Sequence, residues 1–384
     1  MNVRFWPSLQ VITYSRVARG ILYTSDFSEI INFRIGGSIS DDYIRRIRNK
    51  VSTCEVPYFE ANHLPLSTEI QEQLVGVVLA LGREVRLWFL SHLFLDVQDL
   101  YYEVQNILSW HSIGVIDRFE TARGLIRNEN IDVSLRFDFA CRYYSEADVQ
   151  RLWTNMSEDD KNSVRCDRSI SICTGYWLRA LESRTALDWS DLSHASRMFI
   201  GNSMNIRYFF TTLPKRQIRY ECLESGIYFR RINHPDLYYC LVEMNADELR
   251  YIFRRFKKDQ LYKIFKCFLL WPFQTIFLSV MNCLVTYMDA DIFRALICVL
   301  LDKVSEQWKD YEYVDILKRF WNELSSQHGK RVKEDKTLKQ VMKYVLEAPA
   351  PFDVDDFRNF VRTCDTAEHQ IEQRGFQHVF RPWR

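Results

Sequence analysis

The sequence predicts an all-α fold, built as an irregular helical array or a degenerate solenoid of helix pairs in two or three packed units. Three observations predict it. Apolar residues recur at positions i, i+3, i+4 and i+7 along most of the 384-residue chain. The chain has only 12 Gly and 9 Pro, fewer turn residues than sandwiches and barrels use. Helix-capping residues precede several of the apolar stripes. Because 47% of the residues are apolar, a chain of this length can bury more than one core.

We expect an N-terminal helical segment over residues 1–66. Ser40 is placed to cap a helix over residues 43–50. Asp41 and Asp42 lie in the first turn of this helix, where a negative charge interacts favourably with the helix dipole. A proline-bearing stretch follows and ends the segment.

A central helical unit is expected over residues 67–244. Thr68 with Gln71 has the spacing of a capping pair, and Ser145 with Asp148 is a weaker pair of the same kind. Two runs in this unit, residues 206–210 and 218–231, are rich in β-branched and aromatic side chains and could instead form a small hairpin. We favour helices there as well.

A C-terminal helical unit is expected over residues 245–384, beginning at the capping pair Asn245 and Glu248. Residues 267–288 carry no charge and are long enough to cross a bilayer. The polar side chains of this stretch share one helical face, and they are Thr275, Ser279, Asn282 and Thr286. We therefore expect a single helix that is buried on nearly all sides and turns its polar face to a neighbouring helix, rather than a membrane span.

Charge and cysteine content bear on partners and compartment. The 51 Lys and Arg nearly balance the 50 Asp and Glu, so no net charge attracts nucleic acid or anionic lipid. We expect neither nucleic acid nor a membrane as partner. The ten cysteines are scattered, and no signal-peptide pattern opens the chain. These features predict a cytoplasmic or otherwise intracellular protein.

Motifs that carry chemistry are missing from the sequence. We find no P-loop, no GxGxxG, no HExxH, no CxxC and no GxSxG. The acidic run over residues 158–160 is interpreted as the first turn of a helix that Ser157 caps, rather than as a metal site. We therefore predict no catalytic residue, no cofactor, no metal ligand and no enzymatic activity.

Arginines and aromatic residues alternate in two neighbouring regions of the chain, and both types are enriched in protein interfaces. Arg250, Arg254, Lys257 and Lys258 are expected to share one helical face. The predicted partner-binding residues are Tyr208, Arg219, Tyr220, Arg250, Arg254 and Arg255. The alternative is that these aromatic residues fill the core while the charged residues only face solvent.

The function that we expect is that of an intracellular protein–protein interaction or adaptor protein. One alternative is an enzyme with an unrecognised site, which a deep pocket with two or more titratable groups of shifted pKa would indicate. Another is a nucleic-acid or phosphate-binding protein that uses basic helix faces.

Residues 122–161 read ARGLIRNENIDVSLRFDFACRYYSEADVQRLWTNMSEDDK. This block resembles one in an expanded set of helix-rich intracellular arachnid (arthropod) proteins. The later stretches FLLWPFQTIFLSVMNCLV and DILKRFW are similar to segments of the same set. The resemblance implies a helical fold and no particular reaction, ligand or site residue.

Overall fold

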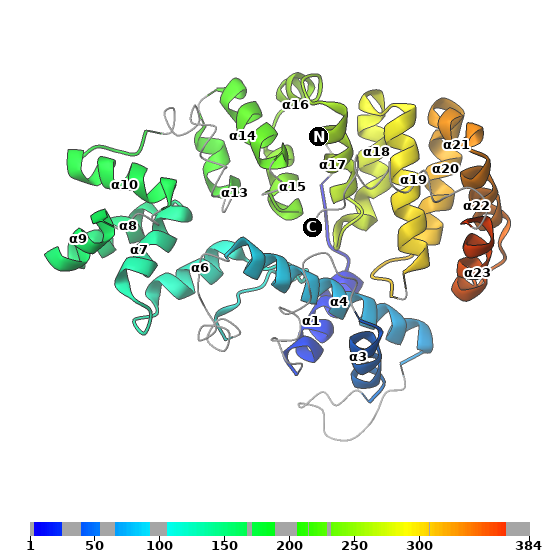
Figure 1. Ribbon diagram of the computed structural model, residues 1–384, viewed down its shortest axis with the longest axis horizontal. Helices are drawn as coiled ribbons and strands as arrows, with labels where there is room; N and C mark the ends of the chain where they lie inside the picture. The colour runs from blue at the N-terminus through cyan, green and yellow to red at the C-terminus, as the bar shows by residue number, and fades with distance from the viewer. Residues whose placement is uncertain are drawn as a thin grey trace. The chain divides into compact units, whose positions relative to one another are not determined.

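The computed structural model describes residues 4–24, 40–53, 66–92, 106–166, 171–188, 206–213, 215–228, 232–306 and 308–365. The regular elements in these ranges are α-helices and short 3-10 helices (Figure 1). Extended backbone pairs there only at an isolated bridge between Trp110 and Ile116. The predicted all-α class is confirmed.

Contacts group the chain into two compact units. Unit 1 holds the described residues between 84 and 252. Unit 2 joins those between 4 and 83 to those between 253 and 365. The divisions fall within α4 (Thr68–Ser91) and α16 (Ala246–Phe253). The described part of the predicted N-terminal segment therefore groups with the C-terminal helices.

Unit 1 is a set of short helices with a dense aromatic core. Its helices are α6 (Arg118–Arg127), α7 (Val133–Arg142), α8 (Glu146–Asn155), α9 (Glu158–Cys166), α10 (Ile172–Ser183), α13 (Ile206–Phe209), η1 (Phe210–Thr212), α14 (Arg216–Tyr228) and α15 (His234–Glu243). Consecutive helices α6, α7 and α8 pack on one another, and α13 packs on α15. The side chains of Phe137, Phe139 and Val149 are fully buried. The helical alternative for residues 206–210 and 218–228 is confirmed, with the Ser225–Gly226 pair inside α14.

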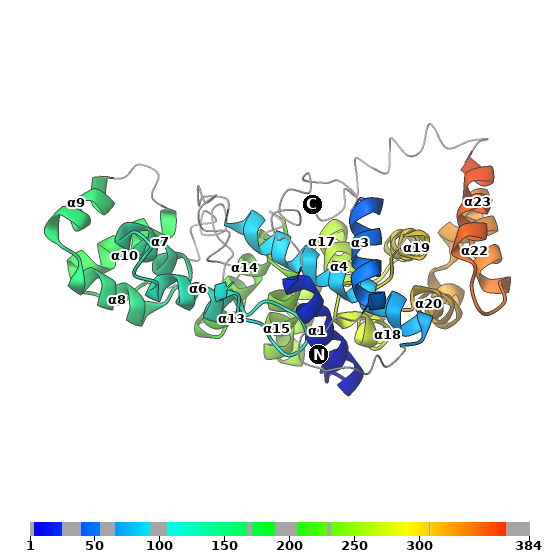
Figure 2. The ribbon, with the colours of Figure 1, turned by 90° about the horizontal axis from the view of Figure 1, so that it is seen from below.

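Unit 2 combines helices of up to 16 residues with short 3-10 turns. They are α1 (Leu9–Tyr23), α3 (Asp41–Thr53), α17 (Lys258–Cys267), η2 (Phe273–Ile276), α18 (Phe277–Leu284), η3 (Val285–Tyr287), α19 (Ala290–Ser305), α20 (Tyr313–His328), α21 (Lys330–Glu334), α22 (Lys336–Glu347) and α23 (Val354–Asp365). Helices α17, α19, α20 and α21 pack side by side (Figure 1). At one end α22 packs on α23, as Figure 2 also shows.

The predicted helix starts are largely confirmed. The Ser40 hydroxyl accepts a hydrogen bond from the Tyr43 N–H at 3.2 Å. Asn245 and Glu248 form a reciprocal capping box, with bonds of 2.9 and 3.2 Å. Ser157 caps α9 by accepting from the Asp160 N–H at 3.1 Å, which confirms the interpretation of the acidic run.

Two predicted caps differ from the structure. The cap of α4 is Ser67 rather than Thr68, since the Ser67 carbonyl accepts from the Gln71 N–H at 3.0 Å. The Ser145 hydroxyl donates to the Asp148 carboxylate at 2.7 Å and makes no cap bond to the backbone. The sequence therefore locates these two helix starts to within one residue, but it does not predict which groups form the capping hydrogen bonds.

The prediction of one continuous helix over residues 267–288 is wrong. Helix α17 ends at Cys267, and two 3-10 turns flank the short α18. Pro272 contributes to the break because it has no N–H to donate within a helix. The polar face was also misplaced, because Thr275, Ser279 and Thr286 are exposed. Of that face, Asn282 alone bonds a neighbouring helix, donating to Glu323 of α20 at 2.9 Å.

Among the described residues, no helix is both long enough and apolar enough to cross a membrane.

Candidate functional site

Unit 1 contains a small cavity lined by polar and aromatic side chains. Its volume of about 20 Å³ has room for about one water molecule. Three parts of the chain supply the lining, namely the segment before α6 together with the first turn of that helix, helix α13, and the start of α15. The lining residues are His111, Val115, Ile116, Asp117, Arg118, Phe119, Arg207, Tyr208, Asn233, Pro235, Asp236 and Tyr239.

Local capping places the charged groups of the cavity. Asp117 caps α6 by accepting from the Glu120 N–H at 3.0 Å, which puts Arg118 in the first turn. Asn233 caps α15 by accepting from the Asp236 N–H at 2.8 Å. Asp236 and Tyr239 are three residues apart on α15 and therefore point to the same side of that helix.

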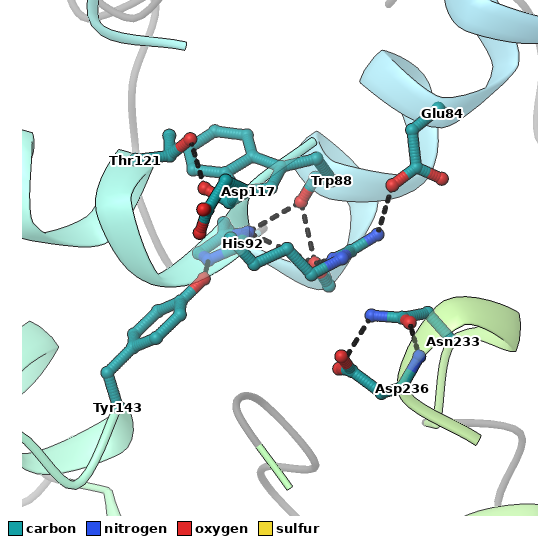
Figure 3. A network of polar contacts seen from close by, with 10 residues as sticks. Glu84, Trp88, His92, Asp117, Thr121, Tyr143, Asn233 and Asp236 are labelled. Carbon is teal, nitrogen blue, oxygen red and sulfur yellow. Dashed lines mark hydrogen bonds and ion pairs between the residues drawn. The ribbon is translucent and has the colours of Figure 1, made fainter. Parts of the chain in front are cut away.

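A hydrogen-bonded network links Arg118 to side chains of α4, among them Glu84, which is labelled in Figure 3. The Arg118 guanidinium donates to the Glu84 carboxylate and to the Ser91 hydroxyl, both at 3.3 Å. His92 directly follows α4. Its Nδ1 lies 2.5 Å from the Trp88 carbonyl, and its Nε2 lies 2.8 Å from the Tyr143 hydroxyl. Burial lowers the pKa of His92 to about 3, so this imidazole is neutral at pH 7 and has a structural role.

Asp236 is a carboxyl group in the lining of the cavity whose pKa is shifted toward neutrality. Its carboxylate accepts a hydrogen bond from the Asn233 side-chain amide at 2.9 Å. Burial raises the pKa of Asp236 to about 6, and Arg118 and Arg207 act in the opposite direction. Burial also lowers the pKa of His111, against the effect of Asp117, whose Oδ2 lies 3.6 Å from His111 Nε2.

Tyr208 brings an exposed ring to the same place. Tyr208 is 44% exposed, and its ring centroid lies 4.4 Å from the ring centroid of Phe119. The Arg207 guanidinium lies 3.5 Å from the ring centroid of Tyr239 and 5.7 Å from that of Tyr208. We name these four residues, Phe119, Arg207, Tyr208 and Tyr239, the Tyr208 surface. It combines a fixed aromatic ring with a cation.

The other predicted partner-binding residues of unit 1 lie elsewhere. Arg219 joins α14 to α16 through an ion pair with Glu248 at 2.8 Å. Tyr220 is only 6% exposed, and its hydroxyl donates to Glu224 at 2.8 Å. Arg250 is exposed and pairs with Asp247 one turn earlier.

The predicted basic helical face is wrong. Helix α16 ends at Phe253, and Arg254 and Arg255 follow it as exposed residues of unit 2. Lys257 caps the next helix, where its N–H donates to the Gln260 side chain at 2.8 Å. Lys258 pairs with Asp289 of the α19 cap at 2.8 Å. Because one helix ends at Phe253 and the next begins at Lys258, the four basic residues do not share one helical face.

The sequence reasoning missed most of the cavity. Asn233 and Asp236 do have capping-pair spacing in NHPD, which could have located the start of α15. No local signal connects that start with His111 or Arg207. Within the described ranges, no group of three or more His, Cys, Asp or Glu side chains could hold a metal ion.

Comparisons with protein-family models, with curated proteins and with solved structures found no match for this chain.

Proposed function

We propose that this chain is a protein-interaction protein and that it binds its partner through the Tyr208 surface. The observation that carries the proposal is the exposure of the Tyr208 ring in a position fixed by its neighbours. An aromatic side chain held in place before binding loses little conformational entropy on association. Tyrosine and arginine are also the residue types that most often contribute large shares of binding energy at interfaces.

The surroundings of the ring support this role. Phe119 packs against Tyr208, and Arg207 lies against Tyr239, so both exposed and half-buried aromatic area is available beside a cation. Polar groups of the adjoining cavity supply hydrogen-bonding capacity at the edge of the surface. Such a combination is typical of an interface centre with a polar rim. We place this interaction inside the cell, since no disulfide joins any two of the described cysteines.

Binding measurements on Tyr208→Ala test the proposal. A partner identified by proximity labelling with the full chain should bind this variant at least about tenfold more weakly, a loss of about 1.4 kcal/mol. The melting temperature should fall only modestly, because the residue is 44% exposed and lies at the surface. Tyr228→Ala is the matched control, since that tyrosine is 62% exposed at the end of α14 and lies outside the surface.

Two outcomes contradict the proposal. One is unchanged affinity in Tyr208→Ala. The other is equal weakening in the Tyr228 control, which would indicate a general effect of removing surface tyrosines. If Arg250→Glu weakens partner binding while Tyr208→Ala does not, the interface lies on the basic residues predicted from the sequence.

A second candidate function, an enzyme, is favoured by one observation. The cavity combines Asp236, whose pKa burial raises to about 6, with His111, whose pKa burial lowers. A carboxylate of this kind is mostly ionised at pH 7 and can accept a proton from a water molecule. The volume fits that water alone, so a substrate would lie over the cavity. Turnover of any substrate should then be lost in Asp236→Asn and retained in Tyr228→Ala.

A further inference from the structure

Two cationic side chains contact one tryptophan in unit 2, and a third lies within electrostatic range of both. The Arg83 guanidinium and the Lys303 ammonium each lie 4.9 Å from the ring centroid of Trp308. Lys266 of α17 interacts electrostatically with both of them. We name Arg83, Lys266 and Lys303 the Trp308 cation cluster. It lies outside the Tyr208 surface and is independent of the proposed function.

The three cations come from separate helices that pack around the same core. Arg83 is on α4, Lys266 is near the end of α17, and Lys303 is near the end of α19. Helices α17 and α19 are in direct contact. Helix α4 approaches the Trp308 segment closely, because a Cβ at Gly76 would lie only 1.8 Å from the Lys309 carbonyl oxygen. The cluster is therefore held by the fold and does not consist of mobile surface lysines.

The positive charges of this cluster are not all paired with carboxylates. Lys303 is buried and pairs with Glu306 at 2.9 Å. Arg83 and Lys266 are half-buried, and neither makes a hydrogen bond or an ion pair with any described residue. Asp302 is the other carboxylate near Lys266, and desolvation raises its pKa to about 6. Three cations thus face two carboxylates in a partly desolvated place, which favours an added anion.

We propose that the Trp308 cation cluster binds the phosphate group of a soluble, phosphate-bearing small molecule. A tetrahedral oxyanion can accept from the Arg83 fork and from an ammonium group at the same time. It would supply the acceptor that the side chains of Arg83 and Lys266 lack among the described residues.

The proposal implies that binding is coupled to a proton on Lys266. Burial is the main cause that lowers the pKa of this amine to about 8; Lys303 and Arg83 contribute in the same direction, while Cys267 and Asp302 act in the opposite direction. Binding of an anion favours the charged amine, so affinity should fall as the pH rises above 8. A structural lysine that never contacts the anion would give no such dependence.

Calorimetric titration of the full chain tests the site, with inorganic phosphate at pH 7 and inorganic sulfate across about pH 6.5 to 9.5, where sulfate does not titrate. Lys266→Gln and Arg83→Gln should each weaken binding at least about tenfold, while the control Lys343→Gln, on the exposed face of α22, should not. Lys266→Arg should restore sulfate binding and keep it above pH 8. A melting curve with each variant confirms that it is folded.

Three results would overturn the proposal. They are equal affinity in the wild type and in both glutamine variants, sulfate binding in the wild type that stays constant above pH 8, and binding to phosphatidic-acid vesicles without any binding of inorganic phosphate. The last result would identify a lipid surface as the source of the anion.

Discussion

At the scale of single residues, the cores of both units contain polar side chains whose hydrogen-bond partners cannot be predicted from the sequence. In unit 2 the Tyr313 hydroxyl is fully buried. It lies 2.7 Å from Asp310 Oδ1 and accepts from the Gln274 side-chain amide at 3.1 Å. Gln274 also donates to Asp310 at 3.0 Å. Buried polar groups of this kind stabilise a fold only while every partner is present.

We predict that Tyr313→Phe lowers the free energy of unfolding by about 1 to 3 kcal/mol, because it leaves Asp310 short of a donor in the core. Urea denaturation measures the change. Tyr311→Phe is the matched control, as that side chain is only half-buried. A loss in the control as large as that in Tyr313→Phe would argue against a role for the hydroxyl.

His92 provides a prediction about pH. Its pKa is about 3 in the folded chain, owing to burial, against a usual 6.5. The unfolded state therefore binds more protons between these two values, and stability falls as the pH drops below 6.5. From pH 7 to 5 this single group should cost about 2 kcal/mol. His92→Asn should show a shallower dependence over that interval than the wild type. Parallel slopes in the two proteins would contradict the prediction.

At the scale of elements, helix α4 illustrates how packing overrides intrinsic preference. Alanine favours helix over glycine by about 1 kcal/mol. Gly76 nonetheless lies inside α4, because the Lys309 backbone passes where a Cβ would stand. Gly20 of α1 has no atom within 4 Å of the same position.

These two glycines give a matched pair of substitutions with opposite signs. Gly76→Ala should destabilise the protein by about 2 kcal/mol or more, since a backbone segment has to move. Gly20→Ala should stabilise it by up to about 1 kcal/mol. Thermal unfolding of both variants measures the difference, and a gain in stability at both positions would show that α4 does not approach Lys309 this closely.

At the scale of the whole molecule, the regular elements of the described residues are helices, grouped in two compact units. The far-ultraviolet circular dichroism spectrum of the full chain should therefore be dominated by helix. A strand content near the average of roughly 20 to 25% for globular proteins would contradict the fold. The proposed roles of the molecule also divide between the units, with the Tyr208 surface in unit 1 and the Trp308 cation cluster in unit 2.

The sequence by itself determined the features that depend on neighbours a few residues away. The all-α class follows from apolar spacing, and the starts at Ser40, Ser157 and Asn245 follow from side chains that bond the backbone of the next turn. Tyr208 could be named as a candidate because it lies among arginines and aromatic residues in the chain.

Only the tertiary structure decided which of these residues are exposed and which groups meet. Tyr208 and Tyr220 look alike in the sequence, yet packing exposes the first and buries the second. The cavity joins His111 to Asp236, and the Trp308 cation cluster brings Arg83 and Lys303 to the same ring. These pairs lie far apart along the chain, so helical periodicity, which reports only the face of one helix, carries no information about their contact. Their meeting depends on how whole helices pack, and that is set by the summed burial of many side chains rather than by any local pattern.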